Sequence, residues 1–155
     1  MKPMTACALL IAAACSGPGS QSSVEPSEPV DQETALHELA DSILAAARAR
    51  DANRFAGFFS NRPDFVYLIN TRHLTSRDTL RDTFARMLER QQRFEPVWRT
   101  RHVQILSADI DVVTGLFDTS AQQQTGEEWQ ASGVVTFVAM REPDGWRVVN
   151  WHTTE

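Results

Sequence analysis

The sequence predicts a single α+β domain, with helices gathered in the first half of the chain and long strands in the second. Apolar residues recur at helical spacing over residues 33–59 and 76–93, whereas residues 98–153 form β-prone runs separated by Gly, Asp and Pro turns. The chain has 155 residues, 42% of them apolar, which is enough for one domain with a real core. Separate groups of helices and strands are typical of the α+β class.

The first fifteen residues have the layout of a secretory signal. Lys2 supplies a positive charge before the apolar run 6–14, which is too short to span a bilayer and ends at Cys15. The stretch 11–15 resembles a bacterial lipoprotein box, although Ala12 stands where that box usually has Leu. We therefore expect a signal peptide over residues 1–14, lipidation of Cys15 and anchoring to a membrane of the cell envelope. The alternative is an ordinary cleaved signal and a soluble periplasmic or secreted protein.

A flexible tether is expected between this signal and the domain. Residues 15–32 are dominated by Ser, Pro, Gly and Glu and lack the apolar side chains that would hold an ordered segment in place. The composition changes at Glu33, so we expect the domain to occupy residues 33–155.

Two helices are predicted at the start of the domain. Asp31 can act as N-cap of the first. One face of that helix carries an apolar stripe formed by Leu36, Leu39, Ile43 and Ala47. A shorter helix is expected over residues 51–59, and it ends before Pro63.

Strands and one further helix fill the rest of the chain. Residues 65–70 predict a short strand and 73–75 its brief partner, after which the capping-box spacing from Thr75 to Asp78 opens a helix that continues to about Arg93. Four long strands are then expected at residues 98–107, 112–122, 129–141 and 146–153. Short turns between them predict an antiparallel meander. The predicted order is α-α-β-β-α-β-β-β-β, with a curved antiparallel sheet wrapped around the helices as a cone with a pocket at its wide end.

Composition excludes several classes of function. The net charge is −5 without a cluster of basic residues, which argues against a nucleic-acid partner. Both cysteines lie in the first fifteen residues, and no His-x-His or His-Glu-x-x-His spacing occurs, so we expect neither a metal nor another cofactor. The only lysine is Lys2, whereas arginine occurs 14 times. That bias reflects either coding preference or recognition of an anion by several arginines.

Three short motifs carry a resemblance to a known family. They are Ala49-Arg50-Asp51 at the end of the first helix, Ser76-Arg77-Asp78 at the start of the third, and Gly145–Val149 followed by His152. In this order they resemble the nuclear transport factor 2-like superfamily, and within it the SnoaL-like bacterial domains, over residues 33–155. The resemblance implies a SnoaL-like, cystatin-like roll with a pocket and frequent dimers through the outer sheet face. Members include ketosteroid isomerase, polyketide cyclases, epoxide hydrolases, dehydratases and proteins that only bind or assemble, so the fold leaves function open.

The last strand supplies the candidate pocket residues. Alternation puts Asn150 and His152 on the face opposite to Arg147 and Trp151. Because Arg147 prefers solvent, we expect Asn150 and His152 to end the inner wall of the pocket, with Tyr67 across from them. Trp151 is then expected outside, where a large aromatic ring suits a homodimer interface.

Three functions stay open at this point. The first is a pocket for a small apolar or amphipathic molecule, without an assignable activity. The second is an isomerase, dehydratase or cyclase-type enzyme in which His152 acts with Tyr67 or Asp118; the isomerase arrangement itself is not reproduced, because the first helix has no Tyr. The third is a homo-oligomeric assembly module of the cell envelope.

Overall fold

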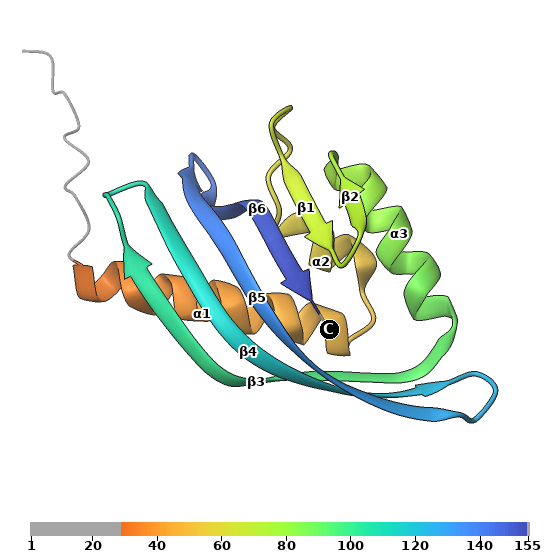
Figure 1. The fold of residues 1–155 in the computed structure, drawn as a ribbon. Helices are drawn as coiled ribbons and strands as arrows, with labels where there is room; N and C mark the ends of the chain where they lie inside the picture. The colour runs from red at the N-terminus through yellow and green to blue at the C-terminus, as the bar shows by residue number, and fades with distance from the viewer. Residues whose placement is uncertain (1–28, 155) are drawn as a thin grey trace, which may run out of the picture.

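The computed structural model describes residues 29–154 of the chain (Figure 1). The predicted signal peptide, Cys15 and residues 16–28 of the tether lie outside this part. The described elements are α1 (Pro29–Arg48), α2 (Ala52–Gly57), β1 (Val66–Ile69), β2 (Arg72–Leu74), α3 (Arg77–Glu89), β3 (Gln91–Ile105), β4 (Ile110–Gln123), β5 (Glu128–Glu142) and β6 (Gly145–Thr154). This order confirms the α+β prediction. Within residues 29–154, no helix is long and apolar enough to cross a membrane.

The strands form one six-stranded sheet in the order β2-β1-β6-β5-β4-β3. Neighbouring strands are antiparallel except β1 and β6, which run parallel. The sheet is therefore mixed, whereas the sequence had predicted antiparallel pairing throughout. Figure 1 shows the long strands β3, β4 and β5 bending around α1, while α3 lies beside β2. This curvature gives the sheet a concave face that the helices cover.

Helix α1 begins earlier than predicted. It starts at Pro29, so Asp31 lies in its first turn instead of capping it. Proline suits the first position of a helix because the N–H it lacks would have no partner there. The predicted apolar stripe is buried against the sheet, as Leu36, Leu39, Ile43 and Ala47.

Helix α3 is shorter than predicted. Ser76, not Thr75, is its N-cap, and the Ser76 Oγ accepts a hydrogen bond from the Thr79 N–H at 3.2 Å. The helix ends at Glu89 instead of Arg93, because β3 already begins at Gln91. Register shifts at Gln91/Arg93 and at Trp98/Thr100 interrupt the pairing of β3 with β4. Such bulges bend a strand, and here they let one long strand follow the curved wall.

Aromatic rings dominate the core under the concave face. Phe59 meets Phe65, Tyr67 and Trp151 edge-on, at centroid separations of 5.7–6.0 Å. Edge-to-face contacts at this range are favourable because ring edges and ring faces carry opposite partial charges. These contacts tie the end of α2 to β1 and β6, which form one side of the site described next.

Candidate ligand-binding site

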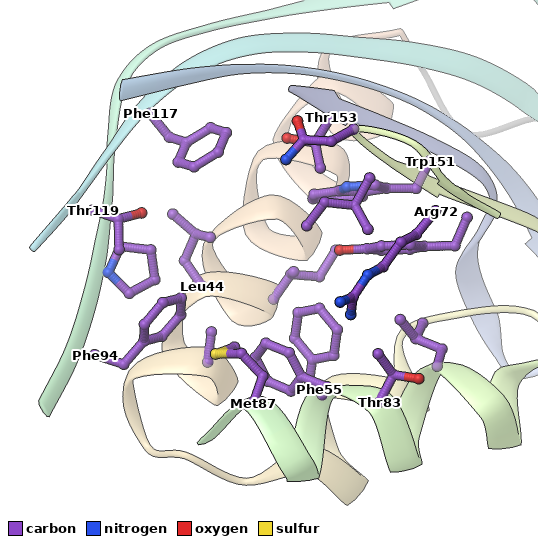
Figure 2. Close-up of a pocket in the computed structure, with 18 of the residues that line it drawn as sticks. Leu44, Phe55, Arg72, Thr83, Met87, Phe94, Phe117, Thr119, Trp151 and Thr153 are labelled. Carbon is purple, nitrogen blue, oxygen red and sulfur yellow. The ribbon is translucent and has the colours of Figure 1, made fainter. Parts of the chain in front are cut away.

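A pocket of about 440 Å³ lies between the concave sheet face and the three helices. Figure 2 shows Leu44 of α1 and Phe117 of β4 on its walls, with Phe55 and Met87 on the helical side opposite the sheet. Most of the lining is apolar, and much of it is aromatic. The aromatic lining residues are Phe55, Tyr67, Phe84, Phe94, Trp98, Phe117, Trp129 and Trp151.

A stack of three rings, two of which line the pocket, supports the wall near β1 and β6. Trp151 lies between Tyr67 and Phe137, with centroid separations of 5.8 and 5.2 Å and interplanar angles of 4° and 6°. Both Tyr67 and Trp151 are more than nine-tenths buried. Parallel rings on three adjacent strands leave little freedom for any one of them to rotate. This wall is therefore preformed.

Two buried polar atoms of the lining have no hydrogen-bond partner in the described part of the chain. They are the Thr119 Oγ1 and the Trp151 Nε1. Thr153, by contrast, donates its hydroxyl proton to the Val134 carbonyl at 3.0 Å. Figure 2 shows Thr119 and Trp151 on opposite sides of the pocket. Because an unpaired buried polar group costs about 1–3 kcal/mol, both atoms are natural contact points for a polar group on a ligand.

Ionisable side chains are scarce in the pocket. Tyr67 lies in the ring stack, and Arg72 is exposed at the opening; no other lining residue within 29–154 can ionise. Carboxylate and imidazole groups, which usually provide acid–base catalysis near neutral pH, are thus missing from the described lining. Nor do residues 29–154 contain a group of three or more His, Cys, Asp or Glu placed to hold a metal ion.

The expected orientation of the last strand is wrong beyond Val148. The pairing of β5 with β6 shifts between Val138 and Ala139, which face Asn150 and Val148 respectively, so Val149 is an extra residue. This bulge reverses the alternation. Trp151 therefore faces the pocket and is 6% exposed, while His152 is exposed and does not line the pocket.

The candidate catalytic residues are not brought together. Asn150 and His152 share the outer sheet face with Asp118, which accepts a hydrogen bond from the Ser132 Oγ at 2.6 Å and lies 3.5 Å from the Arg99 Nε. Tyr67 is on the opposite side of the sheet, in the pocket. The set of His152 with Tyr67 or Asp118 proposed from the sequence is thus not formed.

Sequence reasoning missed Thr119 and Arg72. Alternation from Phe117, a large apolar residue that must face inwards, would have placed Thr119 in the pocket, since it lies two positions further along the strand. Arg72 falls between the two short strands predicted at residues 65–70 and 73–75. No pattern in that segment indicates a pocket residue.

Comparisons with known proteins agree on the fold. A model of the SnoaL-like domain family matches residues 36–153. No protein of curated function matches the sequence. Three similar solved structures are each under 25% identical to this chain, so each shows a shared fold alone.

The three structures differ in described role. A candidate calcium/calmodulin dependent protein kinase II association domain from Xanthomonas campestris has 22% identity and a TM-score of 0.68, covering 77% of this chain and 84% of its own. A candidate dehydratase of the NTF2-like family from Streptomyces avermitilis has 15% identity and a TM-score of 0.73, covering 81% and 97%. A hexachlorocyclohexane dehydrochlorinase from Novosphingobium barchaimii has 14% identity and a TM-score of 0.70, covering 80% and 86%. Together with the pocket and the curved sheet, the match over residues 36–153 shows that the chain belongs to the SnoaL-like domain family.

Proposed function

We propose that this domain binds a small, largely apolar molecule in the pocket and does not carry out acid–base chemistry on it. The observation that carries the proposal is the lining, which is mostly aromatic and aliphatic and, within the described residues, includes no carboxylate and no imidazole. A dehydratase and a dehydrochlorinase are among the similar structures. Such chemistry removes a proton from the substrate, and a suitable base is what this lining lacks.

Size and polarity of the pocket support a binding role. Ligand pockets commonly measure about 300–1,000 Å³ and combine apolar walls with a few placed polar groups. The volume of about 440 Å³ falls in this range. The unpartnered Thr119 Oγ1 and Trp151 Nε1 supply polar contacts on two sides. The preferred ligand is therefore an apolar molecule with hydrogen-bonding groups at separated positions.

A neutral fluorescent probe tests the proposal. N-phenylnaphthylamine is apolar and uncharged, and its fluorescence rises when it enters an apolar site. We expect saturable binding to the wild-type chain and a loss of at least about tenfold in affinity for Ala47→Leu, because the added carbons occupy the pocket. Ala47 is 2% exposed and lines the pocket.

Ala49→Leu is the matched control, since Ala49 is exposed just beyond the end of α1 and does not line the pocket. It should bind the probe as the wild type does. Thermal unfolding of both variants checks that they remain folded. Absence of probe binding to the wild-type chain, or equal affinity of the wild type and Ala47→Leu, would reject the proposed function.

We also propose that the domain is exported and held at the cell envelope by a lipid on Cys15. Support comes from the sequence: a positive charge at Lys2, the apolar run 6–14, the cysteine that ends it, and a Ser- and Pro-rich stretch before the domain. Mass spectrometry of the native protein should find residue 15 as a lipid-modified N-terminus. An unmodified N-terminus downstream of Cys15 would instead support the soluble, exported alternative.

A further inference from the structure

A second hollow of about 550 Å³ adjoins the opening of the pocket. It lies between β2 and the C-terminal half of α3, and we call it the arginine groove. The groove and the pocket share the lining residues Arg72, Leu74, Thr83, Met87 and Gln91. The two hollows therefore lie side by side along these shared side chains.

The groove is positively charged. Arg72, Arg86, Arg90 and His73 line it, and its described lining includes no acidic residue. Within residues 29–154, none of the three guanidinium groups lies in an ion pair with a carboxylate. The chain as a whole has a net charge of −5, so this concentration of positive charge runs against its overall balance.

The arginines come from two different elements. Thr83 and Arg86 lie on α3 and Arg90 is its C-cap residue, so the three side chains, three and four residues apart, share one side of the helix. The Arg86 Nη2 contacts the Thr83 Oγ1 at 3.3 Å and the Arg90 Nε contacts the Arg86 carbonyl at 3.3 Å, which leaves other N–H groups of both side chains available.

A helix C-terminus favours nearby cations, and this accounts for positive charge on the last turns of α3. It does not account for Arg72, which comes from β2. Figure 2 shows the Arg72 side chain reaching over the pocket from β2. Convergence of cations from two elements on one hollow is the arrangement that anion recognition uses, because each guanidinium offers several N–H donors in a fixed fork.

We infer that the pocket and the arginine groove form one site for an amphipathic organic acid. The apolar body lies in the pocket, and a carboxylate or sulfonate head is held by Arg72, Arg86 and Arg90. This inference rests on the proposed function, since it adds an anionic head to the apolar ligand. It narrows the ligand class from largely apolar molecules in general to organic anions with an aryl or alkyl body.

Two probes with the same ring system test the anionic head. Anilinonaphthalenesulfonate carries a sulfonate that N-phenylnaphthylamine lacks. We expect the double variant Arg86→Gln/Arg90→Gln to bind the sulfonate probe about fivefold to tenfold more weakly, as for the loss of two exposed charge contacts. The neutral probe should change less than about twofold, because these two side chains line only the groove.

The control removes two arginines elsewhere. Arg54→Gln with Arg99→Gln lowers the net charge equally, but neither residue lines the pocket or the groove. It should leave both affinities unchanged. Raising the salt concentration should weaken binding of the sulfonate probe but not of the neutral probe, because salt screens exposed charge contacts. Dodecanoate should also displace the sulfonate probe at lower concentration than dodecanol.

The outcomes separate the two proposals. If the neutral probe does not bind the wild-type chain, the proposed function fails, and this inference fails with it. If the neutral probe binds but Arg86→Gln with Arg90→Gln leaves the sulfonate probe unaffected, only the anionic head is overturned. Equal weakening of both probes, or equal weakening by the control pair, overturns it as well.

Discussion

The indole ring of Trp151 stacks on the ring of Phe137 at a centroid separation of 5.2 Å, with 6° between the two planes. The strands β5 and β6 pair at these two residues, so the stack is a direct cross-strand contact. Tyr67 covers the other face of the indole. The wall of the pocket at this point consequently depends on a single side chain that two neighbours hold in place.

Replacement of Trp151 should therefore be costly. We expect Trp151→Ala to lower the free energy of unfolding by about 3–5 kcal/mol, because a large ring leaves a packed core. His152→Ala is the matched control: the neighbouring side chain is exposed on the outer face, so its loss should change stability by at most about 0.5 kcal/mol. Urea denaturation of the two variants measures both values. Similar destabilisation by the two substitutions would contradict the bulge that turns Trp151 inwards.

Two buried threonines of the pocket should respond in opposite directions to the same substitution. The Thr119 hydroxyl has no partner in the described chain, whereas the Thr153 hydroxyl donates to the Val134 carbonyl. Thr119→Val removes an unpaired polar group and should raise the free energy of unfolding by about 1 kcal/mol. Thr153→Val removes a made hydrogen bond and should lower it by about 1 kcal/mol.

Chemical denaturation checks these signs, and ligand binding gives a second test. If Thr119 contacts the ligand, Thr119→Val should be more stable and yet bind the ligand less tightly. A destabilised Thr119→Val would show that the hydroxyl already has a partner, such as a buried water molecule. In that case Thr119 would no longer mark a ligand contact.

The order of elements could be predicted because it depends on local signals. The apolar stripe through Leu36 and Ile43 has helical period, and turns such as Pro143–Gly145 separate β-prone runs. The parallel pairing of β1 with β6 could not be predicted this way. It joins residues far apart in the sequence, such as Leu68 and His152, and no local pattern encodes which strands meet.

The prediction of which β6 side chains line the pocket depended on a single residue, Val149. Alternation correctly relates Trp146 to Val148, and the extra residue Val149 then inverts every later side chain. Nothing in the composition of Gly145–Thr154 distinguishes a regular strand from a bulged one. The arginine groove could not be predicted from the sequence either, because Arg72 and Arg86 belong to two elements whose packing against each other only the structure reveals.

Two glycines should respond differently to alanine. A Cβ at Gly133 would lie 2.6 Å from the Thr154 carbonyl oxygen and 2.6 Å from the Phe117 ring, whereas a Cβ at Gly57 would have no neighbour within 4 Å. We expect Gly133→Ala to lower the free energy of unfolding by about 1–3 kcal/mol. Gly57→Ala should raise it by about 0.5–1 kcal/mol, because alanine suits a helix better.

Gly133 also affects the shape of the pocket. Phe117 pairs with Gly133 across β4 and β5, and its ring lines the pocket. Gly133→Ala should push that ring towards the pocket and weaken binding of the neutral probe, while Gly57→Ala leaves binding unchanged. Thermal unfolding and probe titration measure both effects. Unaltered stability and binding in Gly133→Ala would mean that the sheet yields there without moving the ring.

The outer sheet face is the expected site of self-association. Leu116 and Val134 pair across β4 and β5 and are 39% and 49% exposed, so they form an apolar centre on this face, in place of the Trp151 expected there. We propose that two copies of the domain associate through it, since exposed apolar side chains that cluster often mark an interface.

Leu116→Asp should dissociate the dimer, because it places a charge in an apolar contact. Ile110→Asp is the control, as Ile110 is similarly exposed, at 37%, but lies where β4 begins. Sedimentation velocity should find a dimer for the wild type and for Ile110→Asp, and a monomer for Leu116→Asp. A monomeric wild type at micromolar concentration would rule out this interface.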